Sequence, residues 1–372
     1  MQQWIDEAWE KIVKKFTASS ELAARMGLIP YKSENGTWIA SPFDGDSWWT
    51  NGFWPALMWQ LYAGTKDERF LQEARRVEKL LQKEMMTFEL LNHDVGFMYL
   101  LSSGADYKLT GSDEARRDTL HAATILAGRF NPAGFIRAWG QKGREGWAIV
   151  DCMMNLALLY WANEQTGDPR FLKIARTHAD TTMRCFVRPD GSCNHIVIFD
   201  PETGEMLDAP GGQGYCAGSS WSRGQSWALY GFVISYLHTG DARYLDTAKR
   251  VAHYFISNIR ADGLVDCDFR QPKEPQKLDN IASACAACGL LELAGCVGEH
   301  EQAMYRDAAV RMLRALCESC ADWSDRCQGI LTRCTAAYHE DGAGQETNIT
   351  YGDYFFVEAI AKLRGTDPML WK

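Results

Sequence analysis

A short motif that recurs along the chain constrains its fold more than any other feature. It reads TGDPRFL at residues 166–172 and TGDARYL at residues 239–245, with a related GTKDERFL at residues 64–71 and looser versions that begin at residues 110 and 298. Glycine readily ends a helix in the left-handed conformation, and the aspartate after it is a preferred N-cap of the next helix. The proline of the first version fits a first helical turn. Each motif therefore predicts a tight turn between an inner and an outer helix.

The spacing of the motifs predicts how many helical pairs the chain forms. About 50 to 70 residues separate one motif from the next, which is room for one helical hairpin and a longer loop. Five such junctions together with an N-terminal pair give six hairpins. The long connections, rich in Gly and Trp, all fall at the end of the hairpins opposite the tight turns. An all-α (α/α)6 barrel with one site on one rim is therefore predicted, with an open helical solenoid as the competing architecture.

Apolar residues at three- and four-residue spacing predict helices along most of the chain. Strand-like alternation is short and local, as at residues 192–199, which predicts a hairpin beside the site. No linker or low-complexity tract interrupts the pattern, so residues 1–372 are expected to form a single catalytic domain. The predicted helices lie near residues 54–62, 67–84, 115–129, 150–162, 168–186, 221–238, 241–259, 281–296, 301–320 and 353–363.

Charge and hydropathy exclude several classes of partner. The net charge is −9 and basic residues form no long run, which argues against nucleic acid and anionic membrane surfaces. The first residues lack the basic start and apolar core of a signal peptide, and no stretch of 18 apolar residues predicts a membrane span. A cytoplasmic location is therefore expected, and the oligomeric state stays open.

The cysteines predict neither disulfides nor a metal site. There are 12 of them, but without an export signal disulfides are not expected. The pairs Cys285/Cys288 and Cys317/Cys320 resemble two zinc half-sites, yet the gap between them is longer than zinc ribbons use and both lie in helical sequence. Small buried thiols are the better interpretation, and no metal or other cofactor is expected.

Two carboxylates are set in apolar sequence. Asp94 lies in NHDVGF at residues 92–97, and Asp151 lies in IVDCMMN at residues 149–155. Poor solvation of the charged form raises a carboxyl pKa and makes a general acid. The alternative for each aspartate alone is a helix N-cap. Together with Trp- and Gly-rich segments at residues 47–54, 138–140, 211–214 and 220–227, the pair indicates a carbohydrate-active enzyme.

These segments, taken in order, resemble the unsaturated glucuronyl hydrolases of glycoside hydrolase family 88. The resemblance covers nearly the whole chain, and the unsaturated rhamnogalacturonyl hydrolases match less well. Its most similar stretches are NHD-x-GF at 92–97, DC at 151–152, WA-x-EQTGDP at 161–169, WSRGQ-x-W at 221–227 and GDY at 352–354. The resemblance implies an (α/α)6 barrel that hydrates the C4=C5 double bond of an unsaturated uronic acid at the non-reducing end of lyase-generated glycosaminoglycan oligosaccharides.

The resemblance also implies roles for individual residues. Asp151 falls on the general acid/base, expected to be protonated, and Asp94 on a second carboxylate, expected to be an anion nearby. Arg223 is expected to bind a carboxylate or tune the acid, and Trp221 and Trp227 to stack on sugar faces. The remaining candidate substrate-binding residues are Trp49, His93, Trp139, His195 and Gln213. The sequence at residues 193–195 and 215–217 departs from the family pattern, and a C-terminal basic cluster for sulfated sugars is not evident.

Three other readings stay open at this point. An inverting glycosidase would use one acid and one base around a water molecule at the anomeric carbon of saturated glycosides. A helical-repeat binding protein would not need paired aspartates in apolar settings. A sugar epimerase would need paired histidines at matching positions, which are not found. Fold alone does not separate these functions, because one fold hosts several chemistries.

Overall fold

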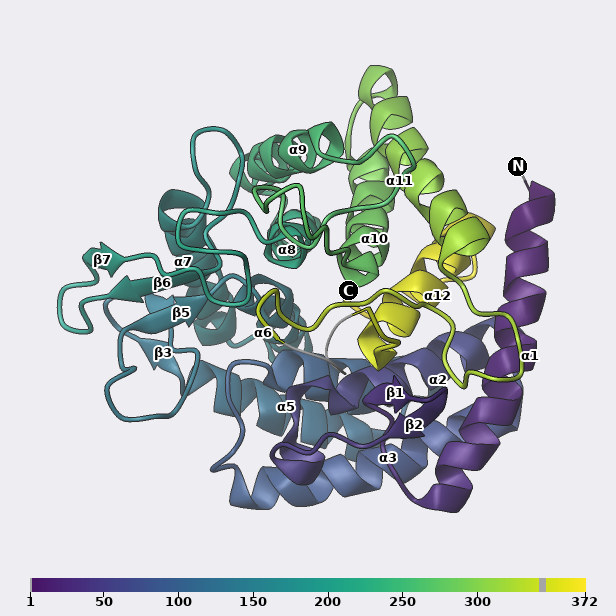
Figure 1. The fold of residues 1–372 in the computed structure, drawn as a ribbon. Coiled ribbons are helices and arrows are strands. Elements are labelled where there is room, and N and C mark those ends of the chain that lie inside the picture. Colours follow the sequence, from purple (N-terminus) through teal and green to yellow (C-terminus); the bar gives the residue numbers. More distant parts are fainter. Residues whose placement is uncertain (1, 341–345) are drawn as a thin grey trace.

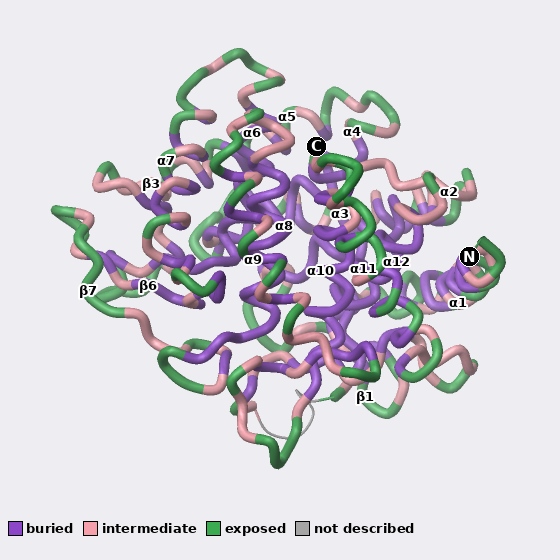
Figure 2. The backbone as a smooth tube through the Cα atoms, turned by 90° about the horizontal axis from the view of Figure 1, so that it is seen from above, coloured by how far each residue is buried: buried purple, intermediate pink, exposed green. Residues whose placement is uncertain are grey.

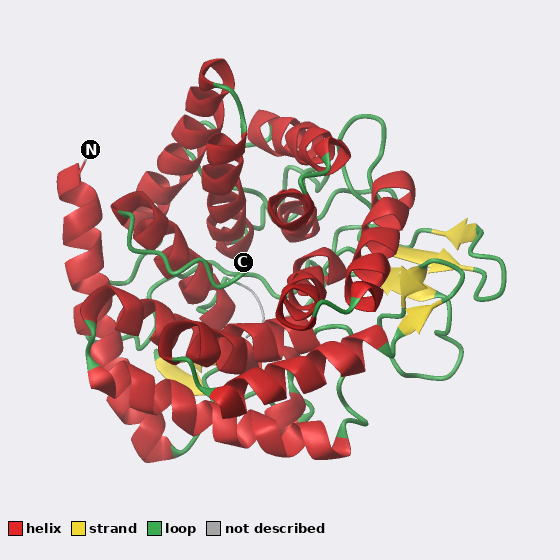
Figure 3. Ribbon diagram, turned by 180° about the vertical axis from the view of Figure 1, so that it is seen from behind, coloured by secondary structure: helices red, strands yellow, loops and turns green. Residues whose placement is uncertain are grey.

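The computed structural model describes residues 2–340 and 346–372, and most of them are helical (Figures 1 and 3). Two short 3-10 helices, η1 (Gly45–Ser47) and η2 (Trp49–Gly52), and the π-helix η3 (Gly96–Gly104) accompany the α-helices. The α-helices are α1 (Gln2–Met26), α2 (Phe53–Thr65), α3 (Glu68–Thr87), α4 (Ala105–Thr110), α5 (Asp113–Ala127), α6 (Cys152–Thr166), α7 (Pro169–Cys185), α8 (Ser222–Thr239), α9 (Ala242–Ser257), α10 (Asn280–Cys296), α11 (Glu299–Ser319) and α12 (Thr350–Arg364).

The helices form two concentric layers. The inner layer runs α2, η3, α6, α8, α10 and α12, each packed against the next, and α12 packs back against α2. The outer layer is α3, α5, α7, α9, α11 and α1 (Figure 1). Because the inner ring closes on itself, the predicted (α/α)6 barrel is confirmed and the open solenoid is wrong.

Sequence pattern separates the two layers. The inner helix α8 is buried without interruption from Ser222 to Ser235, as expected for a helix that is apolar all round. The outer helix α9 buries only one stripe, which includes Tyr244, Ala248 and Val251, and turns its other face to solvent. Figure 2 shows the result as a buried centre inside a more exposed periphery.

Tight turns join five of the inner helices to their outer partners much as the repeated motif predicts. Gly167 and Gly240 have φ values of 69° and 66°, and the side chains of Asp168 and Asp241 accept hydrogen bonds from backbone N–H groups two residues on. In the first copy Lys66, not Gly64, takes the left-handed conformation, at φ 60°. The short turns leave the long connections, and the N-termini of all six inner helices, together at the opposite rim.

The sixth pair is made differently from the prediction. Helix α1 does not pair with a neighbouring N-terminal helix but packs against α12, at the other end of the chain, and against α3. Its buried stripe includes Ile5, Trp9, Ile12 and Phe16. Residues far apart in sequence thus close the outer layer, which a local pattern cannot show.

Three small sheets decorate the barrel. They are formed by β1 (Lys32–Glu34) with β2 (Thr37–Ile39), β3 (Phe130–Asn131) with β4 (Phe135–Ile136), and β5 (Trp147–Ile149) with β6 (Ile196–Phe199) and β7 (Met206–Asp208), all antiparallel. Only the second half of the predicted 192–199 hairpin is a strand. The register pairs Ile149 with Ile196, so the residues that flank these strands, Asp151 and His195, lie side by side.

Aromatic side chains fill the middle of the barrel below the rim. Trp371 enters from the opposite end, is 3% exposed, and stacks parallel to Phe355 with ring centroids 6.2 Å apart. Its indole N–H donates to Glu358 Oε2 at 3.0 Å. Phe53 and Phe97 pack above it. The barrel is therefore open at one rim only. None of the helices that the structure describes is long and apolar enough to cross a membrane.

Candidate active site

A cavity of about 630 Å³ opens at the rim where the inner helices begin. Its walls come from the long connections, which the sequence predicted would share one rim. The described residues that line it are Tyr31, Phe43, Asp44, Trp48, Trp49, Glu89, Leu90, Leu91, Asn92, His93, Asp94, Trp139, Gly140, Gln141, Ile149, Asp151, Gln213, Ala336, Glu340 and Tyr351.

Asp151 occupies the N-cap position of α6 but does not act as a cap. Its side chain makes no capping hydrogen bond, whereas Asp168, Asp241 and Asp279 each accept one from the backbone of the helix that follows. Asp151 is 7% exposed, and its Oδ2 has no hydrogen-bond partner within the described structure. A buried carboxyl oxygen that forgoes a cap and faces a cavity is available for chemistry, so the N-cap explanation of this residue is wrong.

Asp94 lies on the neighbouring connection, just before η3. Its backbone N–H donates to Asn92 Oδ1 at 2.7 Å, and its carboxyl Oδ1 accepts from Asn155 Nδ2 at 3.2 Å. Burial, and next the charge of Asp151, raise the pKa of Asp94 well above its ordinary value. The two carboxyl groups are thus close enough for one to control the ionisation of the other.

Hydrogen bonds to the backbone fix which nitrogen of two imidazole rings carries a proton. His93 Nδ1 lies 3.0 Å from the carbonyl oxygen of Ala138 and must donate to it, so Nε2 of the neutral ring is a lone-pair acceptor. His195 Nδ1 accepts from the backbone N–H of Gln213 at 3.0 Å, so its Nε2 carries the proton. Burial lowers the pKa of His93 to about 4, which keeps that ring neutral.

The two rings therefore present opposite groups to the two aspartates. His93 Nε2 lies 3.2 Å from Asp94 Oδ1, and a lone pair there favours the protonated form of that carboxyl group. His195 Nε2–H lies 3.5 Å from Asp151 Oδ2. The geometry around His93 therefore favours a proton on Asp94. The expectation from sequence that Asp151 is protonated stays a prediction.

Glycine at position 212 is needed for the His195 contact. Gly212 has a φ of 61°, and a Cβ there would lie 2.2 Å from His195 Nδ1. The tight backbone brings the Gln213 N–H onto the imidazole, and the Gln213 side chain lines the cavity while donating to Ala336 O at 2.9 Å. Gln213 thus connects two walls of the site.

The predicted tryptophans take different places. Trp49 and Trp139 line the cavity, and Trp139 packs edge-on against His93 with ring centroids 6.1 Å apart. Trp221 is 3% exposed and lies 4.3 Å from the His195 ring, so it supports that imidazole from behind. Trp227 is fully buried among the barrel's aromatic rings, including Phe97. The prediction that Trp227 stacks on a sugar is therefore wrong.

Arg223 is also placed differently from the prediction. It is fully buried, forms an ion pair with Asp279, and donates to the carbonyl oxygens of Thr335, at 2.7 Å, and Ala336. Its guanidinium lies 4.4 Å from the ring of Trp221. The side chain is fully buried and is not among the described residues that line the cavity, which does not favour the expected direct contact with a substrate carboxylate. The alternative, that Arg223 tunes the acid, stays a prediction. Arg223 fixes the connection whose Ala336 lines the cavity.

Several functional residues escaped sequence reasoning. Asn155 donates to Asp94 and, at 3.2 Å, to the Asp151 carbonyl, and its Oδ1 accepts from the Phe97 N–H at 2.7 Å. The spacing of Asp151 and Asn155 at i and i+4 on a predicted helix was a usable signal for it. Tyr31 lines the cavity without any such local signal. Tyr351 also lines it and directly precedes the GDY stretch at residues 352–354 that sequence analysis singled out.

The cavity offers an anion helix N-termini in place of a lysine or arginine side chain. None of the described residues that line it is basic apart from His93. Six inner helices, however, begin at this rim, and helix N-termini carry partial positive charge and free N–H groups. These N–H groups suit a substrate carboxylate.

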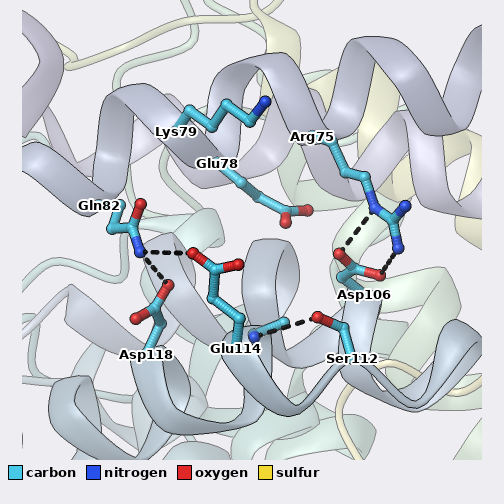
Figure 4. Close-up of a pocket in the computed structure, with 9 residues that line it drawn as sticks. Arg75, Glu78, Lys79, Gln82, Asp106, Ser112, Glu114 and Asp118 are labelled. Atoms are coloured by element: carbon cyan, nitrogen blue, oxygen red, sulfur yellow. Dashed lines mark hydrogen bonds and ion pairs between the residues drawn. The ribbon is translucent and has the colours of Figure 1, made fainter.

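A second cavity, of about 320 Å³, lies on the outside of the barrel between α3 and α5 (Figure 4). Most of its polar side chains have partners within the protein. Arg75 is paired with Asp106 at 2.8 Å, and Gln82 donates to Asp118 at 3.0 Å. Glu78 accepts from the Trp59 indole N–H at 2.8 Å. This groove is held together as an inter-helix contact, in contrast to the unpartnered groups of the rim cavity.

Paired carboxyl groups at the base of an aromatic-lined pocket with a single opening define a glycosidase that works on chain ends. The comparisons identify the family. The model of Glycosyl Hydrolase Family 88 matches residues 4–354, and the chain belongs to that family.

Among its relatives, an unsaturated glucuronyl hydrolase of Bacillus sp. (strain GL1) is 40% identical over 85% of this chain and 86% of its own length. An unsaturated chondroitin disaccharide hydrolase of Streptococcus pneumoniae is 34% identical over 99% of this chain and 93% of its own. The crystal structure of the unsaturated glucuronyl hydrolase from Bacillus sp. GL1 superposes with a TM-score of 0.92 at 35% identity, covering 99% of this chain and 98% of that one. The predicted family is confirmed.

Proposed function

We propose that this glycosidase releases unsaturated uronic acid from the non-reducing end of oligosaccharides that a polysaccharide lyase has produced from glycosaminoglycans, with Asp151 as general acid/base and Asp94 as the second carboxyl group. The observation that carries the proposal is the carboxyl pair at the base of the cavity, with Asp151 Oδ2 unpartnered. Relatives named as unsaturated glucuronyl and unsaturated chondroitin disaccharide hydrolases support the substrate class.

The chemistry follows from the double bond. The C4=C5 bond of the unsaturated sugar is an enol ether, so C4 accepts a proton and positive charge develops at C5 and the ring oxygen. Water adds to C5 and gives its proton to the carboxylate, which restores the pair. The resulting hemiketal opens to a ketone at C5. The ring oxygen becomes a hydroxyl on C1, and C1 then expels the remaining saccharide as it becomes an aldehyde.

The shape of the site supports action on chain ends. The aromatic floor that includes Trp371 closes the barrel beneath the carboxyl pair, so a saccharide enters with one end only. The N-termini of the inner helices favour binding of the uronate carboxylate. Neither this binding nor the entry of a single chain end requires attack at the anomeric carbon.

The proton has to cross the pocket. The surroundings of Asp94 favour a proton there, whereas the proposed donor to C4 is Asp151. A hydroxyl accepts and donates at the same time, so a sugar hydroxyl or one water molecule between the two carboxyl groups can carry the proton from one to the other. The pair then acts as one titrating unit with two apparent pKa values.

Ultraviolet absorbance tests the proposal. The conjugated enol acid absorbs and its hydrated product does not, so we expect absorbance to fall when the protein is incubated with unsaturated chondroitin or hyaluronan disaccharides. Asp151→Asn should reduce the rate at least about a hundredfold, the usual scale of general acid–base catalysis, with an unchanged circular dichroism spectrum. No fall with chondroitin-, hyaluronan-, heparin- or pectin-derived fragments would refute the proposal. Turnover of saturated glycosides instead would favour an inverting glycosidase.

A further inference from the structure

An arginine lies behind the wall of the cavity, next to the carboxyl pair. Arg129 follows α5 by two residues, is half-buried, and is not among the described residues that line the cavity. Its guanidinium donates three hydrogen bonds, all to backbone carbonyl oxygens. They run from Nε to Arg137 at 3.0 Å, from Nη1 to Leu91 at 3.3 Å and from Nη2 to Ala138 at 2.9 Å. These bonds join the connection that leads to Asp94 with the connection that carries Ala138.

One of these carbonyl groups also fixes the imidazole beside Asp94. Ala138 O accepts from Arg129 Nη2 and lies 3.0 Å from His93 Nδ1. The other ring nitrogen of His93 lies 3.2 Å from Asp94 Oδ1. The guanidinium, the carbonyl group, the imidazole and the carboxyl group therefore form one continuous row, in which Arg129 holds the acceptor that sets the His93 tautomer.

The hydrogen bonds of Arg129 do not neutralise its charge. Carbonyl oxygens carry only partial charge, and among the described residues none of the ion pairs includes Arg129. Burial, and next the charge of Arg137, lower the pKa of the Arg129 guanidinium, whereas the charge of Asp94 raises it. Burial and the charge of Asp151 raise the pKa of Asp94, and the charge of Arg129 opposes that rise. Arg129 and the carboxyl pair thus act as counter-charges of one another.

The neighbouring titratable groups are neutral. Burial lowers the pKa of His93 to about 4 and that of His178 to about 3, so both rings are uncharged. Burial also raises the pKa of the Cys152 thiol well above its ordinary value. His195 is neutral because its Nδ1 accepts a hydrogen bond. None of these four groups supplies positive charge to the pair.

Arg223 is a second cation near the pair, but Asp279 pairs with it. We infer that Arg129 is a positioning residue for the proposed reaction: from outside the cavity it holds His93 against Asp94, and its charge keeps the carboxyl pair at one proton and one negative charge. This inference rests on the proposed function and deepens it, because protonation of C4 and activation of water need one carboxyl group in each state.

The pH profile of kcat/KM for an unsaturated disaccharide separates the charge of Arg129 from its hydrogen bonds. Arg129→Gln keeps an N–H donor but removes the charge, and Arg129→Met removes both. Because a nearby cation lowers carboxyl pKa values, both limbs of the profile should move to higher pH by about one unit in either variant. Arg129→Lys keeps the charge and should leave both limbs near their native positions.

Arg137→Gln is the matched control. The Arg137 guanidinium also donates to carbonyl oxygens of a rim connection, those of Gln141 at 2.7 Å and Arg144 at 3.3 Å. Its charge, however, is paired with Glu145 at 3.9 Å. Whatever this replacement does to the rate, it should not move the profile along the pH axis. Circular dichroism establishes that each variant is folded.

A second measurement does not need turnover. An NMR titration of ¹³C-labelled aspartate carboxyl groups, with the Asp94 signal assigned from Asp94→Asn, should give apparent pKa values about one unit higher in Arg129→Gln. Profiles and titrations that the neutral Arg129 variants leave in place, or that Arg137→Gln moves equally, would overturn the inference while the proposed hydration stands. Absence of hydration by the native protein with every disaccharide would instead refute the proposed function.

Discussion

Methionine has a side chain of similar length to that of Arg223 but carries no charge. Replacement of Arg223 by methionine is therefore expected to cause a large, pH-dependent loss of stability. Arg223 and its partner Asp279 are both fully buried. Breaking a buried pair by removing one partner typically costs about 3–5 kcal/mol, because the remaining charge is left without a counter-charge. The variant should therefore be folded but clearly destabilised, in contrast to the expectation from sequence that Arg223 acts mainly on binding or turnover.

The pH dependence has a definite sign. Burial raises the pKa of Asp279 from 3.8 to about 6, and the charge of Arg223 opposes that rise. Even in the native protein, the carboxyl group contributes stability that is fully present below pH 3.8 and is lost as the pH rises through about 6, roughly 3 kcal/mol in all. Without Arg223 this pKa rises further. Below the raised pKa, Asp279 is protonated and its burial costs little free energy. The loss in the free energy of unfolding caused by Arg223→Met should therefore be small at pH 5 and approach its full value at pH 8.

Urea denaturation followed by tryptophan fluorescence at pH 5 and pH 8 measures these differences. The second substitution Asp279→Asn, added to Arg223→Met, removes the charge that would be stranded and should restore much of the stability at pH 8. A loss that is equal at both pH values, or that Asp279→Asn does not reduce, would refute the assignment of the cost to the buried carboxylate.

Three further predictions concern the acid pair, the floor and metal ions. Asp94→Asn should be more stable than the native protein at pH 8, and the difference should vanish towards pH 3.8. Burial and Asp151 raise the pKa of Asp94, so the native protein loses stability as the pH rises through that value. A difference in melting temperature between the two proteins that stays constant across this pH range would contradict the prediction. Trp371→Ala should cost about 3–5 kcal/mol in urea denaturation, since it empties a packed site, whereas Phe88→Ala, at a side chain that is 60% exposed, should cost little; equal effects would mean that the floor is not packed as described. Incubation with EDTA should leave turnover unchanged, because proton transfer between carboxyl groups, water and substrate accounts for the reaction; a loss that added metal restores would count against this chemistry.

The repeated junctions show how much of the fold is predictable from sequence. Left-handed glycines and capping aspartates act over a few residues, so Gly167–Asp168 and Gly240–Asp241 were predictable from local sequence. The pairing of α1 with α12 depends on contacts between the two ends of the chain. No local signal carries such a contact, and the sixth hairpin was therefore assigned to the wrong helices.

The candidate site also has features that local sequence predicts and features that depend on the fold. Asp94 and Asp151 were predictable because each interrupts apolar sequence at the start of an inner helix. Their states of protonation were not, because these depend on the backbone partners of His93 and His195. Arg223 lies beside pocket residues in sequence, but the first turn of α8 directs its side chain towards Asp279, a partner 56 residues away that only the fold identifies.

The pairing of α1 with α12 has a consequence for biosynthesis. The ribosome synthesises α1 long before α12, and at about 5–20 residues per second roughly 20 to 70 seconds separate them. During that time the apolar stripe of α1, which includes Trp9 and Phe16, has no α12 to cover it. The nascent chain therefore exposes an aggregation-prone helix until α12 has been synthesised, and a circular permutant that carries α1 after α12 would shorten that interval to a few seconds.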